Sequence, residues 1–163
     1  MQDIETSFRQ IYENHYPLMQ IKNDIRLPLP PMLMTVVEFI LNRDLVALIE
    51  EEDLDIDRMK TLVEEMKRWA FKRDQAHFSF LASERLSQLM QKLQEHPDDI
   101  VLMEKIAAAF ELLGQLNLDL DLWKAQNIYF AMSRRTYPGV KLFERLGDIL
   151  GVNTTAPSLA RLQ

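Results

Sequence analysis

The sequence predicts an all-α fold, and two observations support that prediction. All four glycines lie in the last third of the chain, so the first 113 residues must turn without the residue that hairpins most often require. Apolar residues recur at intervals of three and four along most of the chain, which is the spacing of one helix face. We therefore expect a compact bundle of about seven helices with short connections, which favour antiparallel neighbours.

The N-terminal part predicts two short helical pieces, an extended segment and a longer helix. An apolar stripe over residues 4–12 should end before Pro17, because proline breaks a helix interior, and residues 18–25 form a second piece. The proline-rich segment 27–31 should be extended. Its last proline suits the first turn of a helix that ends near Glu51.

Each later helix begins at an aspartate or a proline, and several end at a glycine, as helix capping preferences predict. The expected helices run from Asp55 or Asp57 to about Arg73, Asp74 to His96, Asp98 or Asp99 to Gly114, Asp119 or Asp121 to Arg135, and Pro138 to Gly151. Residues 1–152 are thus predicted to form a single helical domain. The tail 153–163 has weak structural signals and should fray.

Composition excludes several classes of protein. The formal net charge of -6 argues against nucleic-acid partners, which need clustered Lys and Arg. No apolar run approaches the roughly 20 residues of a membrane-spanning helix, so no membrane association is expected. The chain contains no cysteine, and its first residues lack the basic start and apolar core of an export signal. A cytoplasmic location is predicted.

The segment 118–130 is the most informative stretch. On helical spacing Trp123, Gln126, Asn127 and Phe130 share one side of a helix. One interpretation is carbohydrate recognition, in which the indole stacks on a sugar and the amides bind its hydroxyls. The other is a structural helix whose Gln126 or Asn127 binds the backbone of a neighbouring loop. We expect Trp123 itself to be a core residue, since large aromatics at helical spacing usually are.

The segment Asn42-Arg43-Asp44 interrupts an otherwise apolar helix, and Asp44 falls on the same stripe as Leu41 and Leu48. A carboxylate at that position requires a partner, because an unpaired buried charge is costly. We expect an ion pair with an arginine of another helix, the named candidates being Arg43, Arg68 and Arg73. A ligand-contacting role for Asp44 is the alternative.

No metal, cofactor or catalytic residue is predicted. The aspartates Asp53, Asp55 and Asp57, with Glu64, imitate the spacing of a calcium loop, but Arg58 stands where such a loop needs glycine. Helix capping and a solvated acidic turn explain them better. The three histidines lie far apart in the sequence, without the paired spacing of a zinc protease.

Three segments together resemble one known family: 37–45, which contains Asn-Arg-Asp; 66–69, which is Met-Lys-Arg-Trp; and 120–127, which ends in Trp-Lys-Ala-Gln-Asn. The chain resembles, over about residues 30–135, the helical domain of unknown function of type 3536. That domain follows the catalytic barrel of glycoside hydrolase family 57-like proteins, whose relatives act on α-glucans or make their branches.

The resemblance implies a non-catalytic accessory domain of an α-amylase or branching-type protein. It would pack on the catalytic barrel, help to shape the substrate groove and contact α-glucan, while the catalytic carboxylates lie on the barrel. The residues that match the family's segments are the candidates for contact with the barrel or with glycan: Asn42, Arg43, Asp44, Trp123, Gln126 and Asn127. The alternative is a helical protein-interaction or scaffold domain unrelated to carbohydrate.

Overall fold

A computed structural model describes residues 2–69, 74–135 and 140–152. Within these ranges the chain forms seven helices and no strand, so the predicted all-α fold is confirmed. Contacts divide the chain into two units, Met1–Phe78 and Ser79–Gln163, which are described separately. The single domain expected over residues 1–152 stays a prediction. No helix in the described ranges is both long and apolar enough to cross a bilayer.

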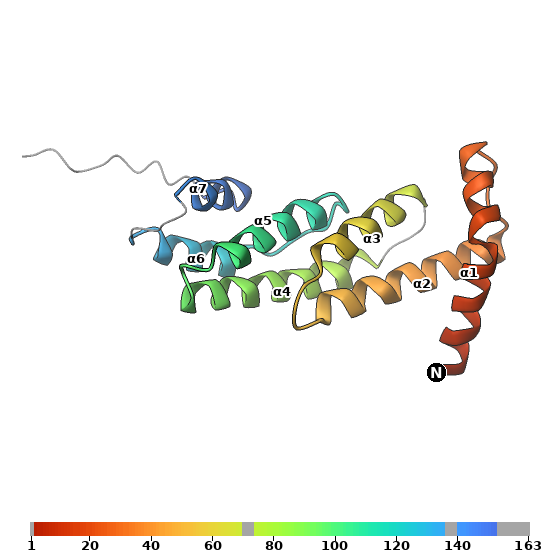
Figure 1. Ribbon diagram of the computed structural model, residues 1–163, viewed down its shortest axis with the longest axis horizontal. Helices are drawn as coiled ribbons and strands as arrows, with labels where there is room; N and C mark the ends of the chain where they lie inside the picture. Colours follow the sequence, from red (N-terminus) through yellow and green to blue (C-terminus); the bar gives the residue numbers. More distant parts are fainter. Residues whose placement is uncertain (1, 70–73, 136–139, 153–163) are drawn as a thin grey trace, which may run out of the picture. The chain divides into compact units, whose positions relative to one another are not determined.

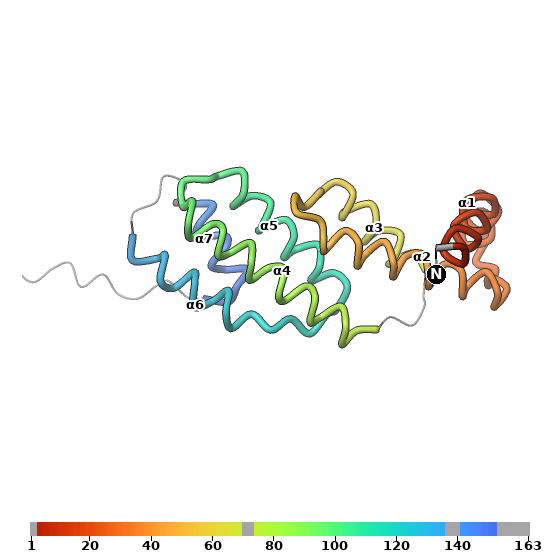
Figure 2. Tube along the Cα trace, turned by 90° about the horizontal axis from the view of Figure 1, so that it is seen from below, coloured from red at the N-terminus to blue at the C-terminus, as the bar shows by residue number. Residues whose placement is uncertain are grey.

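The first unit contains α1 (Gln2–Asp24), α2 (Pro31–Glu50), α3 (Ile56–Arg68) and the start of α4 (Gln75–Glu95). Helix α1 packs across α2, and α2 and α3 lie side by side (Figures 1 and 2). The buried face of α2 is almost entirely aliphatic. It consists of Val36, Val37, Ile40, Leu41, Leu45, Leu48 and Ile49.

Helix α1 runs unbroken through Pro17, so the predicted break before that residue is wrong. A proline inside a helix costs about 3 kcal/mol. Tertiary contacts on both sides of Pro17 offset that cost: Met19 is fully buried, and the Tyr16 hydroxyl donates to Glu65 Oε1 of α3 at 2.6 Å. Burying a side chain such as Met19 contributes about 1.5–3 kcal/mol.

Aspartates cap the next two helices as predicted. Asp55 Oδ1 accepts from the Arg58 backbone N–H at 3.0 Å and begins α3. Asp74 Oδ1 accepts from the His77 backbone N–H at 3.2 Å and begins α4. The third helix ends at Arg68, because Trp69 after it has an extended backbone, so the expected continuation to about Arg73 is wrong. Residues 70–73 lie outside the described residues.

The second unit contains the rest of α4 with α5 (Ile100–Gly114), α6 (Trp123–Met132) and α7 (Val140–Ile149). Helices α4 and α5 lie side by side in both views (Figures 1 and 2). Helix α7 packs on α5. Asp99 caps α5, accepting from the Leu102 N–H at 2.9 Å. Gly151, at φ 67°, follows α7 in the left-handed conformation that glycine favours. The expected start at 138–139 and the tail 153–163 lie outside the described residues.

Helix α6 is shorter than predicted at both ends. It begins at Trp123 rather than at Asp119 or Asp121, and it ends at Met132 instead of Arg135. The backbone N–H groups of both aspartates donate to serine hydroxyls of α4, which holds residues 119–121 along that helix. These contacts join residues about 40 positions apart, so local capping preference does not decide where the helix starts.

Candidate functional site on helix α6

Two serines of α4 position the segment that leads into α6. Ser79 Oγ accepts from the Asp119 N–H at 3.0 Å, and Ser83 Oγ accepts from the Asp121 N–H at 2.9 Å. Ser83 Oγ in turn donates to the Ser79 carbonyl at 2.6 Å, so its hydroxyl both donates and accepts. Asp121 Oδ1 then accepts from the Trp123 N–H at 3.1 Å. These bonds fix the point at which the helix starts, and therefore the direction in which its side chains point.

The inner face of α6 is anchored to α7. Tyr129 is fully buried, its hydroxyl donates to the Phe143 carbonyl at 2.9 Å, and the two rings stack with centroids 4.3 Å apart. Gln126 Nε2 donates to the Leu150 carbonyl at 2.9 Å. The interpretation of Gln126 as a tie to neighbouring backbone is therefore confirmed. The side-chain nitrogen of Gln126 thus provides a hydrogen bond to the carbonyl group of the residue that follows α7.

The outer face of α6 exposes aromatic side chains. Trp123 is 68% exposed and Phe130 is 54% exposed, with Asn127 exposed between them. The Arg134 guanidinium lies 5.3 Å from the centroid of the Phe130 ring, within cation–π range. Since these residues are spaced by four, three and four, they form one outward stripe, which we call the α6 face.

The expectation that Trp123 is a core residue is wrong. The buried residues of α6 are Ala125, Tyr129 and Met132, on the side opposite the α6 face. An aromatic stripe at helical spacing indicates that its members share a face but does not say which face is covered. In α6 the smaller Ala125 takes the inner position, and the tryptophan is left in solvent.

A charged pair borders the α6 face. Lys124 Nζ lies 2.7 Å from Glu84 Oε1 of α4. The hydrogen bond with Glu84 raises the pKa of the Lys124 ammonium, so it stays protonated over a wider pH range. Both side chains are well exposed, so the pair contributes little to stability.

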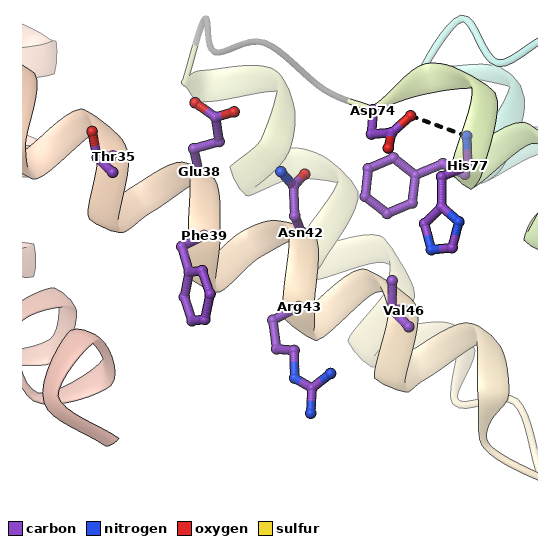
Figure 3. A pocket seen from close by; sticks show the side chains of 9 residues that line it. Thr35, Glu38, Phe39, Asn42, Arg43, Val46, Asp74 and His77 are labelled. Carbon is purple, nitrogen blue, oxygen red and sulfur yellow. Dashed lines mark hydrogen bonds between the residues drawn. The ribbon is translucent and has the colours of Figure 1, made fainter. Parts of the chain in front are cut away.

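The other candidate residues lie on α2 in the first unit and do not converge. Asp44 accepts from both terminal nitrogens of Arg9 on α1, at 2.6 and 3.3 Å. The Arg43 Nε donates to Glu5 at 3.1 Å. Asn42 lines a cavity on another side of α2 (Figure 3). Arg43 lines that cavity as well, and Arg43 and Asp44 both pair with side chains of α1. The three residues therefore have neighbouring surroundings but different partners.

The predicted ion pair of Asp44 with an arginine of another helix is confirmed, but its partner is none of the three arginines named from the sequence. Arg43 binds Glu5, Arg68 binds Glu65 at 2.8 Å, and Arg73 lies outside the described residues. The actual partner, Arg9, is 35 positions away on α1. Its hydrogen bond to Asp44 raises the pKa of Arg9.

Sequence reasoning missed a network centred on Glu65. One carboxylate oxygen accepts from the Tyr16 hydroxyl at 2.6 Å, and the other accepts from the Trp69 indole N–H at 3.1 Å. Arg68 forms an ion pair with Glu65, in which Nη1 lies 2.8 Å from Oε1. The spacing of Glu65 to Arg68 and Trp69 along one helix is a usable signal. No comparable signal indicated Tyr16, because it lies 49 positions from Glu65 in the sequence.

The aspartates at the start of α3 have a structural role at one position. Asp55 caps that helix, as the capping interpretation predicted. Among the residues that the structure describes, no three His, Cys, Asp or Glu side chains are placed to hold a metal ion. The groups that converge at the α6 face are an indole, an amide, a phenyl ring and a guanidinium, which suit binding by stacking and hydrogen bonds.

The fold and the α6 face therefore define a helical protein with an exposed aromatic and amide surface. No family model, curated protein or solved structure matches the chain. The resemblance to the type 3536 domain thus remains an expectation from three segments of the sequence. Any function is a proposal that must be supported by the chemistry of the surface.

Proposed function

We propose that this chain is a non-catalytic accessory domain of an α-glucan-active glycoside hydrolase family 57-like protein of α-amylase or branching type. The observation that carries the proposal is the 68% exposure of Trp123 on the α6 face, with Asn127 one helical turn further on. The resemblance of segments 37–45, 66–69 and 120–127 to the type 3536 domain supports it independently.

The α6 face offers what sugar binding requires. An exposed indole can stack on the apolar face of a pyranose ring, while an amide both donates to and accepts from hydroxyls. Trp123 and Phe130 are seven residues apart, which at the helical rise places their Cα atoms about 10 Å apart along the axis. Only an oligosaccharide can reach both rings, so a linear glucan suits the face better than a monosaccharide.

The same face lacks the groups for glycoside hydrolysis. That reaction ordinarily uses two carboxyl groups, one to protonate the leaving oxygen and one to attack or to activate water. The outward residues Trp123, Asn127, Phe130 and Arg134 include no carboxylate. In this proposal catalysis belongs to a separate barrel, which is the partner of the chain, and the helical domain holds the glucan near it.

Titration with maltooligosaccharides tests the proposal. We expect millimolar dissociation constants, about -4 kcal/mol, and quenching of Trp123 fluorescence. The chain has only two tryptophans, and Trp69 is 2% exposed, so it serves as an internal reference that sugar should not quench. Amide chemical shifts should move along α6, and no oligosaccharide should be hydrolysed.

Trp123→Ala should abolish binding. A matched control is Phe80→Ala, because Phe80 is also an exposed aromatic of the second unit, at 64%, but lies on α4. Unchanged fluorescence and unchanged amide shifts up to saturating maltooligosaccharide would reject the glucan function. Equal weakening by both variants would reject the α6 face as the binding surface.

The alternative, a protein-interaction domain unrelated to carbohydrate, is favoured by α1. Ile4, Leu18 and Ile21 on that helix, and Ile25 directly after it, are between 48% and 60% exposed. Solvent-exposed aliphatic side chains at helical spacing are typical of surfaces that another helix covers. Failure of every maltooligosaccharide to bind would favour this alternative over the glucan function.

A further inference from the structure

Helix α1 carries an apolar stripe with a regular spacing. Ile4, Ile11, Leu18 and Ile25 follow one another at intervals of seven residues, and we call them the α1 stripe. Ile25 comes directly after the helix but keeps its register, because its backbone N–H donates to the Ile21 carbonyl at 3.1 Å. Three members of the stripe are between 48% and 60% exposed, and Ile11 is half-buried.

Another side of α1 makes the contacts with the rest of the first unit. The Phe8 ring lies edge-on to that of Phe39 on α2, with centroids 5.0 Å apart. Tyr16 donates to Glu65 of α3, and Met19 is fully buried. The helix crosses α2 and extends beyond it at both ends (Figure 1). A second helix could therefore lie along the α1 stripe over its whole length.

The spacing of the α1 stripe fits a helix as its partner, and its symmetry fits a second copy of the same helix. A seven-residue repeat drifts by about 20° per repeat on a straight helix, so a helix that crosses at about 20° follows it. Asn14 lies near the middle of the stripe and is exposed. A two-fold axis near Asn14 brings Ile4 close to Ile25 of the second copy. The same axis brings Ile11 close to Leu18 of the second copy.

Charge decides between antiparallel and parallel pairing. Helix α1 begins with Asp3 and Glu5, whereas its end carries Lys22 and, two residues beyond the helix, Arg26. Antiparallel pairing puts the acidic start of each copy beside the basic end of the other, and parallel pairing puts like charges together. Asp24 is also at the basic end, but it points about a third of a turn away from the stripe.

We propose that α1 is a self-association surface, on which the α1 helices of two copies pack antiparallel about a two-fold axis near Asn14. The Asn14 amide both donates and accepts, so it can pair with its own copy and fix the register. Helix α1 has 23 residues and is about 35 Å long. Two such helices bury on the order of 1,000 Å² in total, at the lower end of specific interfaces. The dimer is therefore weak, with a dissociation constant on the order of 50 µM.

Sedimentation equilibrium of the full chain between about 5 and 500 µM tests the association. We expect a monomer–dimer equilibrium for the wild type. Leu18→Glu should remain monomeric with an unchanged far-ultraviolet circular dichroism spectrum. Val101→Glu is the matched control, because Val101 is a 63% exposed aliphatic residue of α5 and receives the same charge. A wild type that is monomeric throughout, or equal dissociation of both variants, would overturn the proposal.

Single cysteines test the antiparallel orientation, since the chain has none of its own. Asn14→Cys should form a disulfide-linked dimer under mild oxidation, because the axis brings position 14 of the two copies together. Ser7→Cys should not, because an antiparallel partner places Lys22 opposite position 7. A parallel pair would link both variants. Equal yields of linked dimer from Ser7→Cys and Asn14→Cys would therefore overturn the antiparallel arrangement.

A charge exchange tests the contact between the ends of the two helices. Asp3→Lys and Arg26→Asp should each weaken the dimer several-fold, and the double variant should restore most of the wild-type affinity. A double variant weaker than either single variant would reject this contact. None of these measurements involves sugar or the α6 face, so self-association can fail while the glucan function stands.

Discussion

The two units differ in the kind of polar contact that ties their helices together. In the first unit the ties are charged and half-exposed: the side chains of Arg9 and Asp44 are 36% and 25% exposed. In the second unit the buried ties are neutral hydrogen bonds to backbone groups, such as that of Tyr129, which is fully buried. Its ion pairs, Lys124 with Glu84 and Arg145 with Glu111, are more exposed than that of Arg9 with Asp44. The first unit should therefore respond to charge and pH, and the second to side-chain volume.

The largest expected effect is that of Gly147→Ala in the second unit. A Cβ atom at Gly147 would lie 2.3 Å from the Tyr129 hydroxyl oxygen and 2.7 Å from its ring carbon Cζ. Tyr129 cannot yield easily, because it stacks on Phe143 and donates to the Phe143 carbonyl. We expect a loss of about 2–3 kcal/mol, measured by denaturant unfolding.

Gly114→Ala provides the control for Gly147→Ala. Gly114 ends α5, and a Cβ atom there meets nothing within 4 Å. Alanine should leave stability unchanged or raise it by up to about 1 kcal/mol, because it favours the helix. Equal losses from both substitutions would mean that helix propensity, and not the contact with Tyr129, limits the second unit.

The next effect is that of Asp44→Ala, which leaves Arg9 without its bidentate partner. We expect about 1–2 kcal/mol of destabilisation, below the cost of breaking a fully buried pair because both side chains are partly solvated. Glu111→Ala breaks the more exposed pair with Arg145 and should cost less than about 0.5 kcal/mol.

Chemical denaturation at two ionic strengths measures both substitutions. The difference between Asp44→Ala and wild type should shrink in high salt, since screening weakens the pair that was removed. Identical midpoints and slopes for Asp44→Ala and wild type would show that the pair adds nothing to the first unit, and the comparison between the units would lose its basis.

A smaller effect is the loss of folding stability that we expect for the first unit at alkaline pH. Burial, with the nearby charge of Glu65, raises the pKa of Tyr12, and burial with the Glu65 hydrogen bond raises that of Tyr16. The folded state therefore keeps protons that the unfolded state loses near pH 10. The stability from these groups is complete below about pH 10 and falls as pH rises above it.

Tyr12→Phe should flatten this alkaline loss, because phenylalanine has no proton to lose. Urea midpoints between about pH 8 and pH 11 measure the slope. Tyr129 in the second unit gives the comparison: Tyr129→Phe removes a neutral hydrogen bond and should lower the midpoint by a similar amount at every pH below about 9. If Tyr12→Phe left the slope of the urea midpoint against pH unaltered, the alkaline loss of stability could not be assigned to Tyr12.

The smallest effect on stability is expected for Trp123→Ala. Because Trp123 is 68% exposed, truncation should change the free energy of unfolding by less than about 0.5 kcal/mol. A thermal or denaturant melt of this variant checks it. A loss of 3 kcal/mol or more, the range of a buried tryptophan, would place the residue in a core and remove the α6 face.

The sequence by itself determined the helices and most of their ends. Interruptions in apolar periodicity and capping aspartates are local signals, so the starts at Asp55, Asp74 and Asp99 followed from side chains that bond within three residues. The need of Asp44 for a partner was likewise visible, because a carboxylate on an apolar stripe is costly wherever the helix packs.

Tertiary structure decided the partners and the exposed faces. Arg9, and not Arg68, reaches Asp44 because α1 packs across α2. Because Ser79 and Ser83 of α4 bind the backbone of residues 119–121, α6 begins only at Trp123, and the indole is left in solvent. These contacts join residues 35 or more positions apart. Helical periodicity sets which residues share a face, but only packing between distant segments sets which face is covered.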